Sequence, residues 1–195
     1  RLRAEGRAAV ETREPGGTEG AEEIRALLVG GAAGRWSAEG EILLFTEARR
    51  DHWEKVIAPA LAEGAVVVCD RFVDSTRVYQ GTTPALRGLV DRLHAMAIGC
   101  EAGMTVLLDI EADAALARAG ARTGREGDAA GGAPESRFER KGLDHARGVA
   151  ARFRALAAEA PERWRVVDAR GTPGEVAARV WTAVAPDLGL PRAGG

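Results

Sequence analysis

A short apolar segment that ends in an acid–base pair constrains the fold of this chain most strongly. Residues 65–70 read Ala-Val-Val-Val-Cys-Asp, and Arg71 follows directly. A continuous β-branched run of this length is typical of a strand buried on both faces of a parallel sheet. Two similar runs, at 104–110 and 163–169, alternate with stretches of helical periodicity. The pattern predicts an α/β fold with a mainly parallel sheet flanked by helices.

The rest of the chain divides into helical stretches and turn-rich loops. A short strand is expected at 8–12, and Ser37 is placed as the N-cap of a long helix that Pro59 kinks or restarts. We expect one domain over 1–195, with a fraying tail at 186–195. The remaining helices are predicted at 19–29, 84–98, 112–122, 138–160 and 172–184.

Composition excludes several classes of protein. The 195 residues carry a formal net charge of −2, so no global basic field indicates nucleic acid or a membrane surface. No apolar run approaches the roughly 20 residues of a spanning helix. The 2 cysteines have no metal or redox spacing, which suits a reducing cytoplasm, and the 3 histidines are scattered. We therefore expect a cytoplasmic protein with structural rather than zinc-binding histidines.

The pair Asp70 and Arg71 has a chemical as well as a structural interpretation. Ligands of α/β proteins lie beyond the carboxyl ends of the strands, where this pair is expected. A carboxylate suits Mg²⁺, directly or through water, and a guanidinium can grip phosphate oxygens with paired donors. An ordinary salt-bridged strand end is the alternative. Polar and aromatic side chains follow within two helical turns, namely Ser75, Thr76, Tyr79 and Gln80.

Three other segments contain candidate functional residues. Phe45 and Arg49 lie four residues apart and share a helical face, as a stacking ring and a base-reading guanidinium would. By itself this spacing favours the alternative, a core ring and a surface ion pair. The turn-rich stretch Arg-Glu-Pro-Gly-Gly-Thr has Arg13 at its entry and could cradle an anion. Residues 118–141 surround a glycine-rich stretch with arginines, as expected of a phosphoryl-transfer lid or of a solvated loop.

In this order the segments resemble the thymidylate (dTMP) kinase family, and the bacterial form fits best. The resemblance rests on "TREPGGT", "LLFTEAR", "VVVCDRFVDSTRVYQG", the arginine-rich loop before "RFE", and "VVDA", and it covers almost the whole chain. It implies a three-layer fold of the P-loop NTPase type. The implied reaction transfers the γ-phosphate of ATP to dTMP with Mg²⁺, giving dTDP for dTTP synthesis. It also implies a homodimer.

The resemblance assigns roles by position on the nucleoside side. Phe45 resembles the ring that stacks on thymine, and Arg49 resembles the arginine that bonds the base carbonyl near the acceptor phosphate. Thr76 lies where a polar side chain reads the base edge. Tyr79 matches the aromatic residue under the deoxyribose that disfavours a 2′-hydroxyl.

On the phosphate side, Asp70 and Arg71 match the pair that serves Mg²⁺ and phosphate positioning, and both are expected to act in catalysis. Arg122 resembles the catalytic lid arginine, with Arg118 supporting it at the ATP side. The lid departs from the pattern, because Ser136 stands where the family usually has Asp and a Gly/Ala-rich stretch looks inserted. The choice among Arg122, Arg125 and Arg137 therefore stays open.

A further departure concerns the ATP phosphates. The family's phosphate-binding loop, Gly-x-x-x-x-Gly-Lys-Ser/Thr, occurs nowhere in the 195 residues, and the chain begins as if inside a fold. We expect a truncation of the first strand and this loop, and a polypeptide that is inactive by itself. Alternatives are another nucleoside monophosphate kinase, acting on dUMP, UMP or a modified base, and a non-catalytic nucleotide-binding or scaffold protein.

Overall fold

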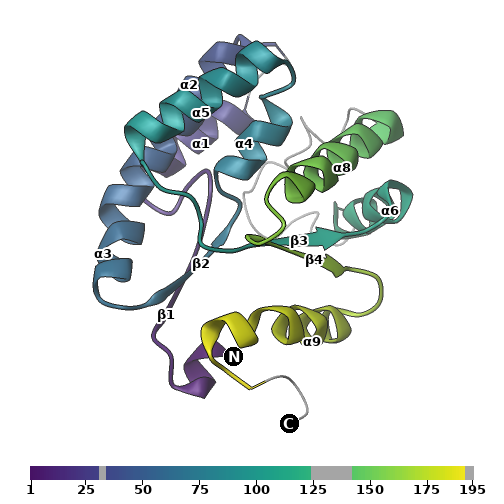
Figure 1. Ribbon diagram of the computed structural model, residues 1–195. Coiled ribbons are helices and arrows are strands. Elements are labelled where there is room, and N and C mark those ends of the chain that lie inside the picture. Colours follow the sequence, from purple (N-terminus) through teal and green to yellow (C-terminus); the bar gives the residue numbers. More distant parts are fainter. Residues whose placement is uncertain (31–33, 124–141, 192–195) are drawn as a thin grey trace. The chain divides into compact units, whose positions relative to one another are not determined.

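The computed structural model describes residues 1–30, 34–123 and 142–191. They form two compact units, 1–101 and 102–195, and each contains one pair of parallel strands with its helices (Figure 1). The predicted α/β class with parallel strands is therefore confirmed. The expectation of a single domain stays a prediction, because compactness does not establish how the units fold.

The first unit is built on β1 (Ala9–Arg13) and β2 (Val66–Asp70). These strands pair in parallel from Ala9 opposite Val66 to Arg13 opposite Asp70. Parallel pairing brings the two carboxyl ends together, so the segments that follow Arg13 and Asp70 leave the sheet at the same edge. The strand predicted at 8–12 is shifted by one residue, and Arg13, predicted in the loop, is the last residue of β1.

Local sequence signals set the helix boundaries of this unit. Ser37 caps the long helix as predicted, since its side chain accepts a hydrogen bond from the Gly40 N–H. The long stretch is interrupted before Pro59 by a π-helical turn and then continues as a short helix. The helical elements are η1 (Leu2–Glu5), α1 (Glu19–Val29), α2 (Ala38–His52), η2 (Trp53–Ile57), α3 (Ala58–Ala62), α4 (Val73–Tyr79) and α5 (Pro84–Ala97).

The core of the first unit joins the helices that carry the predicted site. Ile42 of α2, Val73 of α4 and Val90 of α5 are buried together, and Phe72 packs against them with three leucines. Full burial of each such side chain contributes roughly 1.5–3 kcal/mol. This cluster therefore fixes α2 against α4, so residues on the two helices can meet at defined distances.

The second unit has the same local plan. Strands β3 (Thr105–Asp109) and β4 (Trp164–Asp168) pair in parallel, with Asp109 opposite Asp168 at their carboxyl ends. Helices α6 (Ala112–Thr123) and α8 (Gly142–Glu159) lie between β3 and β4 in the chain. Helix α9 (Pro173–Val184) follows β4, and a 3₁₀ turn, η3 (Pro186–Leu188), comes after it. Each strand is followed by a helix, as the alternating apolar runs predict.

One expectation about the strands is wrong. Strands β2 and β3 are not buried on both faces, because Val68 in β2 is 50% exposed and Leu108 in β3 is 51% exposed; Val166 in β4 is likewise 55% exposed. Side chains alternate between the faces of a strand, and the neighbouring positions are more covered than these three. A continuous apolar run therefore marks a strand here without marking burial of both its faces.

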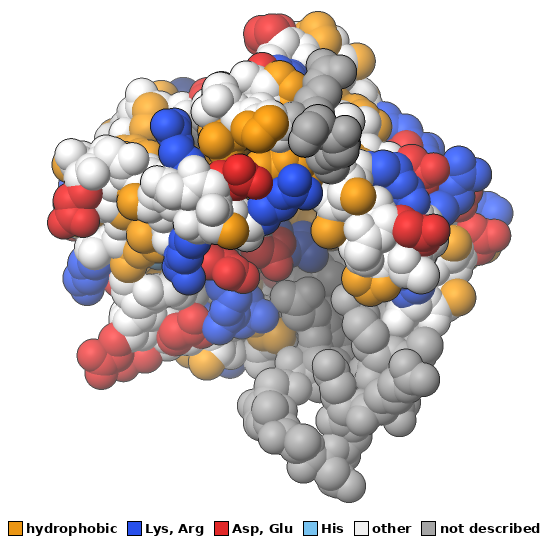
Figure 2. Space-filling model, turned by 90° about the horizontal axis from the view of Figure 1, so that it is seen from below, with side chains coloured by type: hydrophobic (Ala, Val, Ile, Leu, Met, Phe, Trp, Pro, Cys, Tyr) orange, Lys and Arg blue, Asp and Glu red, His pale blue; other side chains and the backbone are white. Residues whose placement is uncertain are grey.

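The surface agrees with the near-neutral composition. On the face that Figure 2 shows, acidic and basic side chains are interspersed among the described residues, without an extended field of one sign. None of the described helices combines the length and the apolarity that crossing a bilayer requires.

Candidate active site

The edge where β1 and β2 end gathers the chemically distinctive residues of the first unit. The Glu14 N–H donates to the Asp70 main-chain oxygen at 2.9 Å, which extends the strand pairing by one residue. The Asp70 carboxylate is exposed. The Arg71 guanidinium lies over the Tyr79 ring, 5.4 Å from its centroid. The structure therefore brings together two predicted site residues, Arg71 and Tyr79, and Asp70 adjoins Arg71 in the sequence.

Arg71 has a left-handed backbone conformation, with φ of 69°. This conformation is uncommon for residues other than glycine and is enriched at functional sites. The Cys69 thiol donates to the Arg71 main-chain oxygen at 3.1 Å, on the other side of Asp70. Burial raises the pKa of Cys69 to about 12, so the thiol keeps its proton near neutral pH and can donate it.

Arg49 is the most buried of the predicted site residues with a charge, with 3% of its side chain exposed. Its Nε donates to Glu14 Oε2 at 2.8 Å, and its Nη2 donates to Thr76 Oγ1 at 2.9 Å. The Phe72 ring covers the guanidinium at 5.4 Å. Arg49 thus links the loop after β1 to helix α4, and it meets Thr76 as a shared base-reading role requires.

A histidine continues this network behind Glu14. His52 Nδ1 lies 3.2 Å from Glu14 Oε1, and its Nε2 lies 2.7 Å from Thr12 Oγ1. The His52 side chain is fully buried, and Glu14 is 4% exposed. A carboxylate buried to this extent needs partners on both oxygens, and Arg49 and His52 supply them.

The loop after β1 already holds an anionic group. Glu22 Oε1 accepts from Arg13 Nη2 at 2.8 Å and from the Gly17 N–H at 3.0 Å. A Cβ on Gly16 would lie 2.4 Å from that same oxygen, so only glycine allows the approach. The predicted anion cradle is therefore filled by the chain's own carboxylate in this structure, and Arg13 is turned toward it.

The other predicted substrate residues lie on the same two helices. Ser75 and Thr76 are in α4, Ser75 half-buried and Thr76 buried. Gln80 is buried just beyond α4 and donates to Glu41 of α2 at 3.3 Å. Phe45 of α2 is half-buried. The Gln80–Glu41 hydrogen bond is thus a second link between α2 and the end of α4, in addition to the Arg49–Thr76 hydrogen bond.

The predicted lid residues belong to the second unit. Arg118 of α6 donates to the main-chain oxygens of Ala169 at 2.7 Å and Gly171 at 3.0 Å, in the loop after β4. The backbone of Arg122 is in α6, but its side chain lies outside the described residues, as do Arg125 and Arg137. Arg118 therefore ties a helix to the strand-end loop, and the catalytic lid arginine stays a prediction.

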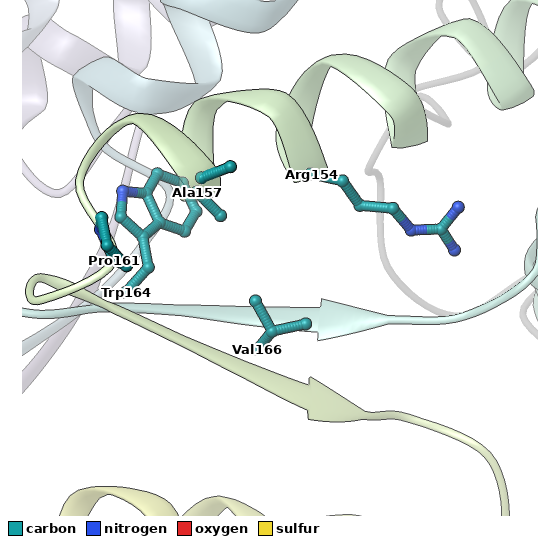
Figure 3. Close-up of a pocket in the computed structure, with 6 residues that line it drawn as sticks. Arg154, Ala157, Pro161, Trp164 and Val166 are labelled. Atoms are coloured by element: carbon teal, nitrogen blue, oxygen red, sulfur yellow. The ribbon is translucent and has the colours of Figure 1, made fainter.

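A cluster of potential metal ligands and a pocket also occur in the described residues, and neither is assigned to the predicted site. Potential metal-ligating atoms of Glu14, His52 and Cys69 lie within 4.8 Å of one another, but hydrogen bonds already engage all three side chains. A pocket with a volume of about 280 Å³ lies between α8 and β4 in the second unit, and Figure 3 shows residues that line it. Its lining contains no predicted site residue and consists of Arg154, Ala157, Ala158, Pro161, Trp164 and Val166.

Comparison with known proteins identifies the family to which these motifs belong. The sequence model of the thymidylate kinase family matches residues 1–180. The chain belongs to the thymidylate kinase family. It is 54% identical to the thymidylate kinase of a Jannaschia species, covering 96% of this chain and 86% of the relative. It is 50% identical to that of Ruegeria pomeroyi, covering 98% and 87%.

A solved thymidylate kinase structure supports the same assignment. The crystal structure of thymidylate kinase from Ehrlichia chaffeensis matches with a TM-score of 0.61 and 28% sequence identity, covering 85% of this chain and 72% of that one. The chain therefore has the α/β fold of the P-loop NTPases, as predicted, and membership of the thymidylate kinase family makes it a phosphotransferase.

Sequence reasoning missed three residues of this site. Glu14 and His52 complete the Arg49 network, and Phe72 covers it. Glu14 lies inside the quoted Arg-Glu-Pro-Gly-Gly stretch, where only the arginine was singled out. His52 follows Arg49 by three residues, hence on the same helical face, and this spacing could have identified it.

Proposed function

We propose that this protein phosphorylates dTMP to dTDP, with ATP as the phosphate donor, in the synthesis of dTTP. The observation that carries the proposal is the 54% identity to a thymidylate kinase over 96% of the chain. The arrangement of Arg49, Thr76, Arg71 and Tyr79 around the end of β2 supports it. Cytoplasmic location and a homodimer belong to the same proposal.

On the nucleoside side, Arg49 and Thr76 recognise the base. Arg49 supplies donors for a thymine carbonyl, and the Thr76 hydroxyl accepts from Arg49 while keeping its own proton to donate. Phe45 and Tyr79 supply rings for the base and the deoxyribose, while Ser75 and Gln80 line the approach from α4. Since Arg49 is only 3% exposed, a base reaches it after the covering side chains shift.

On the phosphate side, Arg71 binds and orients the acceptor phosphate. Its planar fork matches phosphate oxygens, and stacking on Tyr79 limits its freedom. The exposed Asp70 carboxylate, which makes no hydrogen bond or ion pair within the described ranges, offers the hard oxygen that Mg²⁺ prefers. Bound there, Mg²⁺ would neutralise charge on the phosphates. Arg13 contributes a second cation at this edge, and Arg118 and Arg122 serve the ATP side.

A dTMP titration of the purified protein tests the proposal. Calorimetry is expected to show dTMP binding at least tenfold tighter than binding of dUMP, UMP or AMP, because the site reads base and sugar. Incubation of the protein with dTMP, ATP and Mg²⁺ is expected to produce dTDP, detected by ion-exchange chromatography. Equal affinity for all four nucleotides would reject the substrate assignment.

A further inference from the structure

We infer that His52 is a positioning residue for nucleobase recognition, acting through Glu14 on Arg49. The inference rests on the proposed function, because it takes Arg49 as the group that reads the base. The His52 side chain lies behind Glu14, fully buried, and is linked to the Arg49 guanidinium through that carboxylate. The chain Thr12–His52–Glu14–Arg49–Thr76 connects β1, α2 and α4 by side-chain hydrogen bonds.

The hydrogen-bonding capacities along these five residues allow an arrangement in which the polar atoms are paired. The Glu14 carboxylate can accept from Arg49 Nε, at 2.8 Å, and from His52 Nδ1, at 3.2 Å. When the His52 proton is on Nδ1, Nε2 can accept from the Thr12 hydroxyl, 2.7 Å away. In this arrangement every polar atom of His52 and both oxygens of Glu14 have a partner.

The function of this series of hydrogen bonds is to fix the plane of the Glu14 carboxylate. With Oε1 held by His52, Oε2 faces Arg49 Nε in one orientation, and Thr76 holds Nη2 at 2.9 Å. Arg49 Nη1 makes no hydrogen bond within the described part of the chain, so its donors remain for a ligand. Without His52, the carboxylate could rotate about its last bond, and the guanidinium would lose a unique orientation.

The loop after β1 is packed against this same hydrogen bond. A Cβ on Gly17 would lie 2.6 Å from His52 Nε2 and 2.8 Å from Thr12 Oγ1. Gly17 also has φ of 90°, a conformation that favours glycine. The backbone at Gly17 therefore closes over the Thr12–His52 contact, and the Gly17 N–H points to Glu22 on the loop's other side.

Two substitutions of His52 separate positioning from simple packing. His52→Asn keeps a donor near the Nδ1 position facing Glu14, whereas His52→Gln keeps an acceptor near Nε2 facing Thr12 and loses the Glu14 contact. We expect H52Q to weaken dTMP binding about tenfold, and H52N to stay within about threefold of the wild type. The preference for dTMP over 5-methyl-dCMP, which carries an amino group in place of the base carbonyl, should shrink about tenfold in H52Q only.

His94→Gln is the matched control. His94 is also buried, at 4% exposure, but its Nε2 contacts the main-chain oxygen of Cys100 at 2.9 Å and not Glu14. H94Q is expected to lower the melting temperature while dTMP affinity and base preference stay within twofold. Equal losses in H52N and H52Q, or an unchanged base preference in H52Q, would overturn the positioning role.

Two further variants keep the test decisive. Arg49→Ala probes the proposed function: if it leaves dTMP affinity unchanged, Arg49 does not read the base, whereas a loss in R49A with none in H52Q rejects only the role of His52. Should H52Q fail to fold, Thr12→Val removes the hydroxyl that holds Nε2 and nearly preserves shape. T12V is expected to weaken dTMP binding about threefold, and unchanged affinity would overturn the inference.

Discussion

At the scale of single residues, the site combines a strained backbone with a buried charge. Arg71 holds its guanidinium over Tyr79 from a left-handed conformation, and the Cys69 thiol binds its main-chain oxygen. Arg49 instead has its charge balanced by Glu14 inside the protein. Breaking such a buried pair from one side costs about 3–5 kcal/mol. The two arginines therefore differ in how well the fold tolerates their substitution. Arg71 is exposed, so replacing it affects folding less than replacing Arg49.

Arg71→Ala is therefore expected to affect chemistry far more than binding. Charge on the transferring phosphoryl group is where this guanidinium acts, so kcat should fall by about 100-fold or more. The dissociation constant of dTMP should rise less than fivefold. Steady-state kinetics measures the change in kcat, and calorimetry measures the change in the dissociation constant.

Arg71→Lys serves as the control for this prediction. It keeps the positive charge but loses the paired donors and the stacking on Tyr79, so an intermediate kcat is expected. Equal losses of kcat and of dTMP affinity in Arg71→Ala would show that the residue binds substrate without favouring the transition state.

At the scale of elements, the sequence predicts the helices and strands well and the contacts between them less well. The helix at 19–29 and the Ser37 cap agree with prediction because spacing and capping are local signals. The π-helical turn at Trp53–Ile57 carries no comparable signal. Glu14 and His52 lie 38 positions apart, so their contact depends on how β1 and α2 pack and no pattern in either segment reveals it.

Helix α9 offers a quantitative test of these local signals. The Thr172 side chain caps the helix by accepting from the Glu175 N–H, while Glu175 Oε2 accepts from the Thr172 N–H at 2.7 Å. Thr172→Ala removes half of this capping box, at a cost of about 1 kcal/mol. Urea unfolding followed by circular dichroism should show this loss, together with a melting temperature lower by about 2–4 °C.

Thr182→Ala is the matched control within the same helix. Thr182 is exposed, and its hydroxyl donates only to the Ala178 main-chain oxygen of the preceding turn. Because alanine favours helix more than threonine, this variant should be as stable as the wild type or slightly more stable. A larger loss in Thr182→Ala than in Thr172→Ala would contradict the capping interpretation.

At the scale of the whole molecule, hydrogen bonding shifts the pKa values of several carboxyl groups in the same direction. Hydrogen bonds lower the pKa of Asp51, Glu101, Asp168 and Glu175 below their ordinary values. For Glu101, the largest cause of the lowered pKa is its hydrogen bond to Arg77. This guanidinium is 9% exposed and also binds Asp74 and Asp91. Each such group stabilises the fold above its unfolded pKa, and this stability is lost as pH falls through the folded pKa.

His94 adds a pH dependence closer to neutrality. Burial lowers its pKa below the ordinary value of 6.5, against the raising effect of the Glu101 carboxylate, and Arg49 and Arg77 lower it further. As pH falls through about 6.5, the unfolded chain takes up a proton that the folded chain still refuses, so the free energy of unfolding decreases. Its Nδ1 has no hydrogen-bond partner within the described ranges, which leaves the added proton without compensation.

Urea unfolding between pH 7.5 and pH 5 tests this contribution. The wild type is expected to lose stability steadily over this range, whereas His94→Gln, which cannot titrate, should show a flatter profile. Glu101→Gln should retain the wild-type slope from pH 7.5 to about 6, because a carboxyl with a lowered pKa stays ionised there. If His94→Gln kept the full slope, the acid sensitivity of the protein near neutral pH would have to originate from another titrating group.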